Sequence, residues 1–291
     1  MSRTVSPKKV PTRSTETSVT PVKITEVECK NALVRSRIEG TDYALNPYTG
    51  CQHGCIYCYA EFMKKYTNHK EEWGEFVDVK INIVDRLRDQ IKRTKPGVIQ
   101  LSTVTDAYQP LEETFQLTRG CLEILADFDF PISIQTKSNL VLRDIDVLKK
   151  IKDKDVGFTI TCPDSEVERI FEPGASTLER RLEALRKLQD NDIPTFVFVG
   201  PILPFFSDNI RSLQRLFRKL QTMGINKIYL DKMNYLKGKR KKIGSVLKKQ
   251  FPRALRLYEG AAKHEERYTE WLKGNLVSAL SEFSFDSEVL F

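Results

Sequence analysis

Three closely spaced cysteines carry the clearest chemical signal in the sequence. Cys51, Cys55 and Cys58 lie in the stretch NPYTGCQHGCIYCYAE, residues 46–61, with the spacing C-x3-C-x2-C. Thiolates this close together repel one another unless a metal neutralises them. The spacing therefore predicts a metal centre.

Two kinds of metal centre compete for these thiols. Structural zinc takes four ligands, so His53 or His69 would have to complete the set. An iron-sulfur cluster usually takes four cysteines, and three would leave one iron without a protein ligand and open to chemistry. The cysteines by themselves leave both alternatives open.

Other polar side chains follow predicted strands at the point where each strand ends. In folds built on parallel strands, catalytic groups gather at the carboxyl ends of the strands. We therefore expect these side chains near the cysteines: Thr103, Thr105, Asp106, Lys137, Ser138, Thr161, Cys162, Asp231 and Asn234.

Strands and helices are predicted to alternate along the part of the chain that holds these residues. Apolar runs predict strands at residues 43–45, 98–103, 131–136, 156–161, 194–199 and 226–230. Helical periodicity predicts helices at 83–93, 115–128, 141–151, 177–189, 209–223 and a closing helix at 259–272. Continuous apolar strands alternating with helices indicate a parallel sheet. We predict an α/β fold, an open or partial (β/α)6 barrel rather than a complete eightfold one.

The chain divides into three expected regions. Residues 1–28 are rich in Ser, Thr, Pro and Lys and are predicted to be a disordered tail. Residues 29–236 hold the predicted core, and residues 237–291 are a basic, mostly helical C-terminal extension.

The positive charge is local. The chain carries a net charge of +8, and residues 237–257 contain nine basic and no acidic residues, which leaves about -1 for the rest. Such a segment binds phosphate backbones, docks an acidic protein or stays solvated.

Length and composition exclude several classes of protein. The chain has 291 residues, 40% of them apolar, which suits a globular protein. Its longest apolar stretch, residues 196–206, is 11 residues long and interrupted by glycine and proline, whereas a membrane-spanning helix needs about 20. Residues 1–25 lack the apolar run of a secretory signal, so we do not expect export. We expect a cytoplasmic protein with reduced thiols and no membrane contact.

The cysteine motif resembles the signature of the radical S-adenosylmethionine (radical SAM) superfamily, in which an aromatic residue, here Tyr57, precedes the last cysteine. The resemblance implies a core of radical SAM type and a [4Fe-4S] cluster held by the three cysteines. It also implies that the amino and carboxylate groups of SAM chelate the remaining iron. A single electron then cleaves SAM to methionine and a 5'-deoxyadenosyl radical, which abstracts a hydrogen atom.

A closer resemblance, from residue 43 to about residue 235, is to the spore photoproduct lyase-like branch, also described as DNA repair photolyase-like. Four stretches carry it: NPYTGCQHGCIYCYA (46–60), LSTVTDAYQPLE (101–112), QTKSNLVLRDIDVLKKI (135–151) and FEPGASTLERRLEALRKL (171–188). By this resemblance Thr105, Lys137 and Thr159 would contact SAM. Lys137 alternatively caps a helix or reaches solvent, and Thr159 is alternatively a plain strand residue.

Two tyrosines flank the last cysteine. Tyr57 would pack by the adenine or the cluster, and Tyr59 matches a tyrosine implicated in passing a hydrogen atom. An aromatic residue at either position also excludes water. Asp106 either binds the ribose of SAM or caps the next turn.

The sequence departs from this branch at one important position. Where spore lyases keep a hydrogen-donating cysteine, this chain has Thr103, whose O–H bond is too strong to quench a carbon radical readily. Repair of the thymine photoproduct is therefore in doubt. Cys162 is a candidate substitute thiol, although a buried cysteine more often behaves as a small apolar residue.

Three functions compete. The first is a radical SAM enzyme acting on a nucleic acid base or lesion, with residues 237–257 on the phosphate backbone. The second acts on a small molecule or protein, and the basic segment docks a flavodoxin- or ferredoxin-like electron donor. The third is a noncatalytic, metal-stabilised binding protein.

Overall fold

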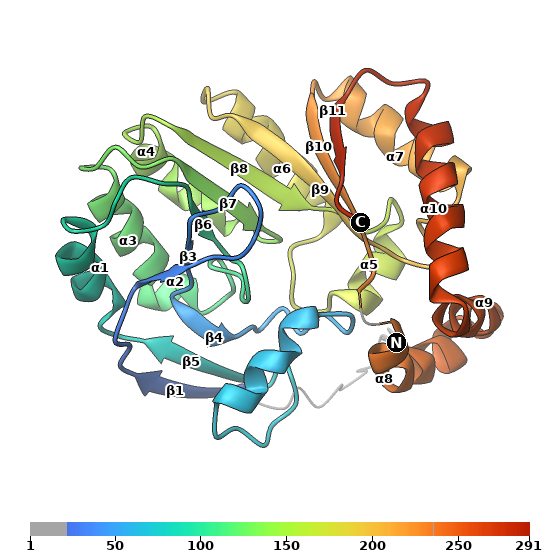
Figure 1. Ribbon diagram of the computed structural model, residues 1–291, viewed down its shortest axis with the longest axis horizontal. Helices are drawn as coiled ribbons and strands as arrows, with labels where there is room; N and C mark the ends of the chain where they lie inside the picture. Colours follow the sequence, from blue (N-terminus) through green and yellow to red (C-terminus); the bar gives the residue numbers. More distant parts are fainter. Residues whose placement is uncertain (1–21, 235) are drawn as a thin grey trace, which may run out of the picture.

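A row of eight strands forms the centre of the computed structural model, which describes residues 22–234 and 236–291 (Figure 1). In spatial order the strands are β11 (Asp286–Val289), β10 (Lys227–Lys232), β9 (Thr195–Ile202), β8 (Lys154–Thr159), β7 (Ile132–Thr136), β6 (Ile99–Leu101), β3 (Tyr43–Leu45) and β2 (Leu33–Arg35). Neighbours are parallel except β2 and β3, which are antiparallel.

The predicted α/β fold with a parallel sheet is confirmed. The six expected strands, β3 and β6 to β10, lie side by side in this row. The row is open, because its end strands β2 and β11 do not pair with each other. Strand β11 adds a further parallel strand that the sequence analysis did not anticipate, since its four residues are all exposed and carry no apolar pattern.

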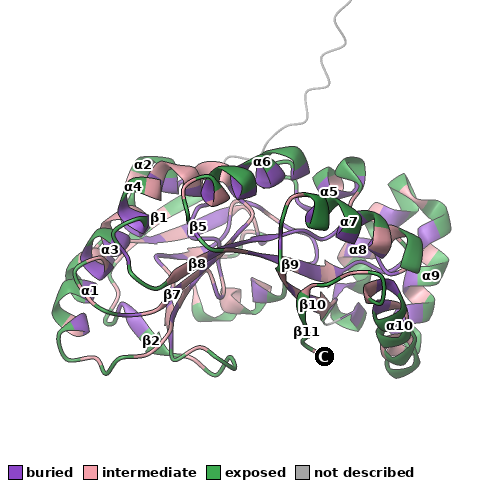
Figure 2. Ribbon diagram, turned by 90° about the horizontal axis from the view of Figure 1, so that it is seen from above, coloured by how far each residue is buried: buried purple, intermediate pink, exposed green. Residues whose placement is uncertain are grey.

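Helices connect the strands (Figure 1). They are α1 (Ile83–Ile91), α2 (Glu112–Phe115), α3 (Leu117–Leu125), α4 (Ile145–Leu148), α5 (Ser165–Phe171), α6 (Leu178–Gln189) and α7 (Ile210–Thr222), with two 3-10 segments, η1 (Tyr59–Tyr66) and η2 (Asn139–Asp144). Helix α6 shows the pattern well. Leu178, Leu182, Leu185 and Leu188 are buried, and the Thr177 hydroxyl caps its first turn. Figure 2 shows such buried stripes facing the sheet.

Two of the expected helices are shorter than predicted. The segment 115–128 is divided because Gln116 adopts a left-handed backbone conformation (φ 50°) between α2 and α3. The segment 141–151 consists of η2 followed by the short α4.

A second, three-stranded sheet lies beside the first and consists of β1 (Lys23–Val27), β5 (Phe76–Lys80) and β4 (Tyr48–Gly50). Most of the predicted disordered tail, residues 1–21, lies outside the described residues. Residues 23–27 are instead strand β1, which pairs in parallel with β5, so regular structure begins before residue 28.

Three helices follow β10 and pack at one end of the sheet (Figure 1): α8 (Leu236–Gln250), α9 (Pro252–Lys263) and α10 (Glu265–Leu280). The prediction of one closing helix at 259–272 is wrong, because the helix breaks at His264, whose backbone is not helical (φ -122°, ψ 55°). Within the described residues, no helix combines the length and apolarity needed to cross a membrane.

Candidate cluster-binding site

The three cysteines lie on the loop that connects β4 to η1. The loop begins at Gly50, whose φ is +90° and where a Cβ atom would approach the Phe76 carbonyl oxygen to 2.4 Å. Gly54, with φ +58°, packs against Gly74. Only glycine adopts this backbone conformation and fits this space without strain. Gly50 therefore sets the direction in which the chain turns toward the thiols.

Cys58 links the surroundings of the other two cysteines. Cys51 is buried in an apolar cluster with Ala60, Trp73 and Phe76. Cys55 is buried in a second apolar cluster, to which Tyr57 also belongs. Cys58 packs against both clusters, so the three cysteines share continuous apolar surroundings.

The protein environment keeps two of these thiols neutral in the absence of a metal. Burial raises the pKa of Cys55 well above its ordinary value, although Lys137 opposes this. Burial also raises the pKa of Cys58, and Cys51 adds to the effect. A metal that binds thiolates here must displace protons, so its affinity will rise with pH.

The two histidines considered as a fourth zinc ligand already lie beside carboxylates. Among the described residues, no three His, Cys, Asp or Glu side chains lie close enough to hold one metal ion. A zinc ion with Zn–S bonds of about 2.3 Å needs its sulfur ligands less than about 4 Å apart. His69, one of the two possible fourth ligands, already engages Glu71 at 3.1 Å and Asp78 at 2.7 Å. His53 lies 3.3 Å from Asp106.

Lys137 follows the carboxyl end of β7, and its side chain lies among the negative groups of the site. Burial opposes its charge, but Cys55, Glu172 and Asp106, in that order, raise the pKa of the ammonium above its ordinary value. Within the described part of the chain, Lys137 Nζ forms no hydrogen bond and no ion pair. A partly buried cation without a direct partner is typical of a site for an anionic ligand group.

Asp106 ties together the segments around the thiols. Its Oδ1 accepts hydrogen bonds from the Tyr108 amide at 2.9 Å and the Thr136 hydroxyl at 2.7 Å. Its Oδ2 accepts from the Lys137 amide at 2.8 Å and lies 3.3 Å from His53 Nδ1. Burial alone would raise the pKa of Asp106, but His53 holds it below its ordinary value. These partners use most of the carboxylate's acceptor capacity.

Thr105 and Gln109 join the loop after β6 to the cysteine loop. The Thr105 hydroxyl donates to the Gly50 carbonyl at 2.5 Å. The side chain of Gln109, which is fully buried, accepts from the Gln52 amide at 2.9 Å and donates to Thr105 Oγ1 at 3.1 Å. The two residues therefore fix the position of the loop on both sides of Cys51.

Tyr57 and Glu172 connect the cysteine loop to α6. The Tyr57 hydroxyl donates to Glu172, which also binds the guanidinium of Arg181. Arg181 is fully buried and donates further to the carbonyls of Ser176 at 2.7 Å and Thr159 at 3.0 Å. Burial would raise the pKa of Glu172, but Arg181 and Lys137 hold it below the ordinary value.

Thr159 ends β8 and is held from two directions. Its carbonyl accepts the bond from Arg181, and its hydroxyl oxygen accepts from Gln135 at 3.1 Å. Two residues later, Thr161 Oγ1 is buried without a hydrogen-bond partner among the described residues. The carboxyl end of β8 therefore presents an unused hydroxyl.

Tyr59 reaches across to the residue that replaces the expected donor cysteine. Its hydroxyl donates to the carbonyl of Thr103, and its ring is half exposed. The Thr103 hydroxyl oxygen accepts from the Asn46 amide at 2.7 Å. The structure thus brings Tyr59 and Thr103 together on one side of the cysteine loop.

Cys162 lies in the same apolar cluster as Cys55 and Tyr57. Its thiol is buried and 3.9 Å from the Phe206 carbonyl. Burial raises the pKa of Cys162 to about 12, so the thiol keeps its proton at neutral pH.

Sequence reasoning missed one contact that joins the C-terminal helices to this site. Lys239 of α8 is buried and forms an ion pair with Glu61, in the helix that begins directly after Cys58. A signal was present, because Lys239 occupies a position in the buried stripe of Leu236, Ile243 and Leu247.

The residues present fit an iron-sulfur cluster with a small zwitterion beside it. Three shielded thiols supply ligands for three irons, and the Lys137 ammonium is available for a carboxylate. The indole N–H of Trp73 is buried in the cluster of Cys51 without a hydrogen-bond partner among the described residues. Sulfur atoms of a cluster are acceptors for such a donor.

Comparisons with known proteins agree with this geometry. The family model described as the radical SAM superfamily matches residues 45–220. An uncharacterized protein of Methanocaldococcus jannaschii is 40% identical over 187 residues, which cover 64% of this chain and 70% of the relative. The radical SAM Nalpha-GlyT isomerase of Pseudomonas phage M6 is 23% identical over 186 residues, 62% of this chain and 37% of that protein.

Solved structures resemble this chain in fold. A spore photoproduct lyase variant with bound AdoMet and dinucleoside spore photoproduct has a TM-score of 0.68 and 18% sequence identity. The match covers 92% of this chain and 82% of that one.

Proposed function

Because the chain belongs to the radical SAM superfamily, which implies a [4Fe-4S] cluster and SAM, we propose that it generates a 5'-deoxyadenosyl radical and directs it at a nucleic acid base. When bound, the cluster and SAM supply the hard step: one electron breaks the C5'–S bond of SAM, giving methionine and a radical that abstracts hydrogen. The observation that supports the proposal most is the unpaired Lys137 ammonium beside the cysteine loop.

The residues of the loop have distinct proposed roles. Cys51, Cys55 and Cys58 hold three irons, and the apolar clusters around them exclude water. Lys137 pairs with the carboxylate of SAM, since an ammonium on a flexible stem can follow this group closely.

Thr105, Thr159 and Tyr57 shape the SAM pocket around Lys137. Thr105, in the loop after β6, holds the cysteine loop through its hydroxyl, and Thr159 presents a hydroxyl at the end of β8. The Tyr57 ring packs by the iron-sulfur cluster and is oriented by Glu172. Asp106 acts mainly by positioning His53 and Lys137, because its oxygens are already hydrogen-bonded.

Tyr59 and Cys162 are the proposed hydrogen-atom donors. Thr103 cannot take this role, because its O–H bond is strong. The Cys162 thiol stays protonated and lies in the apolar cluster of Cys55. Tyr59 is half exposed and donates a hydrogen bond to the Thr103 carbonyl.

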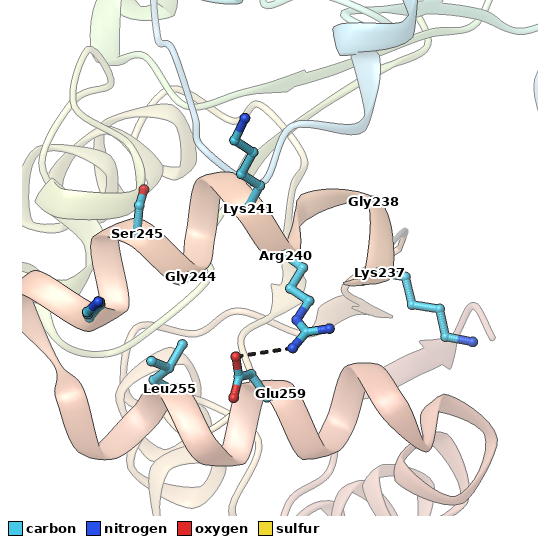
Figure 3. A pocket seen from close by; sticks show the side chains of 9 residues that line it. Lys237, Gly238, Arg240, Lys241, Gly244, Ser245, Leu255 and Glu259 are labelled. Carbon is cyan, nitrogen blue, oxygen red and sulfur yellow. Dashed lines mark hydrogen bonds and ion pairs between the residues drawn. The ribbon is translucent and has the colours of Figure 1, made fainter.

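A basic groove between α8 and α9 supports the proposal that the substrate is a nucleic acid. It encloses about 640 Å³ and is lined by Lys237, Arg240, Lys241 and Lys248 (Figure 3). Glu259 lies opposite and pairs with Arg240 at 3.4 Å. The remaining three lysines have no ion pair among the described residues, so they are free to contact phosphate groups. The likeness to a lyase solved with a dinucleoside photoproduct supports the same class.

The chemistry is tested by an anaerobic assay with SAM and dithionite. We expect 5'-deoxyadenosine from the reconstituted protein and none from Cys55→Ala. A Cys29→Ala variant is the matched control, because Cys29 lies outside the loop and should leave the yield unchanged. Undiminished 5'-deoxyadenosine from Cys55→Ala would refute the proposed chemistry.

The substrate class is tested by binding at graded salt. We expect single-stranded or duplex nucleic acid to bind at low salt, with the double variant Lys241→Gln/Lys248→Gln weakening binding and lowering the slope of log K against log salt by about 0.7 to 0.9 per lost phosphate contact. The control is Lys149→Gln/Lys150→Gln, two exposed lysines outside the groove. If no nucleic acid binds while a reduced flavodoxin does, the groove belongs to the electron donor instead.

Radical SAM enzymes generally need a reductant, and we propose a flavodoxin- or ferredoxin-like partner in a reducing, cytoplasmic compartment. All six cysteines are free, which suits such a compartment. Transfer of one electron from a reduced flavodoxin, measured as 5'-deoxyadenosine formation without dithionite, tests the partner.

A further inference from the structure

A second pocket lies away from the cysteine loop, between the β9–α7 connection and helices α9 and α10. It encloses about 550 Å³, within the range of about 300 to 1,000 Å³ typical of small-molecule sites. The β9–α7 connection contributes Pro204, Phe205, Asp208 and Asn209, and the rest of the lining comes from the two helices and from His264 between them. No step proposed for the cysteine loop uses this pocket.

The lining combines aromatic rings with positive charge. Phe205, Tyr268 and Trp271 supply the rings, and those of Tyr268 and Trp271 lie 5.8 Å apart at 33°. Phe205 and Trp271 are 40% and 49% exposed and line the same pocket, and grouped exposed apolar side chains mark binding sites. Flat rings of this kind bind other flat rings by stacking.

The charged residues of the pocket are three potential cations and one acid. Arg256, His264 and Arg267 line it, and within residues 22–234 and 236–291 their side chains form no ion pair or hydrogen bond. Asp208 is the acid, but its Oδ2 accepts hydrogen bonds from the Phe205 amide at 2.9 Å and the Tyr268 hydroxyl at 3.1 Å. Asp208 therefore holds the pocket walls in place, and the free charge is positive.

Two local features that cost stability meet at this pocket. Phe205 has a left-handed backbone conformation, φ 77°, which is rare for a bulky residue. Gly260 lies inside α9, where glycine is a poor choice, and an added Cβ would have nothing within 4 Å. Such departures from local preference concentrate at functional sites.

We propose that this pocket binds a small planar aromatic molecule carrying an anionic group, the chemistry shared by a nucleotide and an aromatic carboxylate. The rings of Phe205, Tyr268 and Trp271 take the planar group, and Arg256 and Arg267 take the anion. Binding at this pocket does not require the chemistry proposed for the cysteine loop.

The pocket is linked to that loop through one residue. Phe206, next to Phe205, contacts the Cys162 thiol through its carbonyl, and its ring lies 5.5 Å from that of Phe171. Phe171 precedes Glu172, which binds Tyr57. An occupant that moves Phe205 would therefore act on the surroundings of Cys162.

The test is isothermal titration calorimetry on the cluster-loaded protein with four probes: nucleoside 5'-monophosphates, the matching nucleosides, inorganic phosphate and indole-3-carboxylate. We expect a probe with both ring and charge to bind at least tenfold more tightly than nucleoside or phosphate alone. Preference for the monophosphate over the carboxylate identifies a nucleotide, and the reverse identifies an aromatic acid. No binding at millimolar concentrations, or equal binding of phosphate alone, overturns the proposal.

Variants place the binding in the pocket. Gly260→Leu should fill it and weaken binding at least tenfold, whereas Gly274→Leu in α10, with equally open space around its Cβ but outside the pocket lining, should not. Arg256→Gln/Arg267→Gln should lose the preference for charged probes, with Arg218→Gln on α7 as the control. Equal affinities for the Gly260 and Gly274 variants would contradict this assignment, while 5'-deoxyadenosine formation without the ligand is expected from all of them.

Discussion

The hydroxyl of Tyr59 donates a hydrogen bond to the backbone carbonyl of Thr103, although 44 residues separate them in sequence. Thr103 occupies the position where the spore lyase-like pattern has a cysteine, so the contact places an aromatic O–H beside the site of the missing thiol. The buried, protonated thiol of Cys162 lies in the apolar cluster of Cys55. These two groups are the exchangeable hydrogen donors that we assign to the radical reaction.

We predict that product formed in D2O carries solvent deuterium from one of these two donors. The variant that removes the acting donor, Tyr59→Phe or Cys162→Ala, should lower this incorporation at least tenfold. The same variant should leave 5'-deoxyadenosine formation intact. Mass spectrometry of product and 5'-deoxyadenosine from the same reaction measures both. Undiminished deuterium in both single variants and in the double variant would exclude the assigned donors.

We predict that Glu172→Ala destabilises the protein by about 3 kcal/mol, because it leaves the buried Arg181 guanidinium without one of its carboxylate partners. Glu183→Ala on α6 is the control. Glu183 pairs with Lys187 at the surface, where such a pair contributes little to stability. Urea unfolding of the metal-free proteins gives both values, and equal losses for the two variants would show that Arg181 does not depend on Glu172.

Glu168 gives the protein a predictable pH dependence. Burial, with Glu172 nearby, raises the pKa of Glu168 from about 4.5 to about 7, although Arg181 opposes this. The raised value favours the protonated carboxyl in the folded state. The stabilisation from this shift, up to about 3 kcal/mol in the free energy of unfolding, is fully present below pH 4.5. It falls as the pH rises toward about 7 and is lost above that pH.

Glu168→Gln should therefore flatten this part of the stability profile. Unfolding free energies of both proteins at pH 5 and pH 8 measure the difference, with the Glu183→Ala variant expected to keep the wild-type slope. Identical slopes for wild type and Glu168→Gln would mean that another group produces the pH dependence.

The ion pair between Lys239 and Glu61 should couple α8 to the cysteine segment. Because Lys239 is buried and Glu61 is partly exposed, a double-mutant cycle with Lys239→Gln and Glu61→Gln is expected to give a coupling energy of about 1 kcal/mol. The exposed pair of Arg240 and Glu259 offers a matched cycle with a smaller expected value. A coupling no larger than that of the exposed pair would show that Lys239 does not hold α8 against the site.

The main parallel strands were predictable because each is an apolar run between turn residues. Strand β11 was not, since Asp286–Val289 is exposed and joins the sheet through backbone bonds to β10 alone. Strand β1 was hidden for the same reason within a polar stretch. The break at His264 follows continuous helical periodicity with no proline or glycine at that residue, so no stop signal marks it in the sequence.

The site divides in a similar way. The spacing of the cysteines predicts their shared role, and polar residues after strands predict Lys137 and Asp106 near them. The exact partners depend on tertiary contacts, as the pair of Glu172 and Arg181 shows, because it forms between a loop residue and a buried position of α6. The pocket between the β9–α7 connection and α10 is beyond sequence reasoning, because Phe205 and Trp271 are far apart in the chain and each looks like an ordinary apolar residue.

Electron paramagnetic resonance of the dithionite-reduced, anaerobically reconstituted protein, with iron and sulfide analysis of the same sample, decides whether three cysteines hold an open cluster. We predict about four irons and four sulfides per chain, a reduced-cluster signal that changes when SAM is added, and loss of both in Cys55→Ala. One zinc per chain, or a cluster signal that does not change when SAM is added, would contradict the claim that one iron is open, on which the proposed chemistry depends.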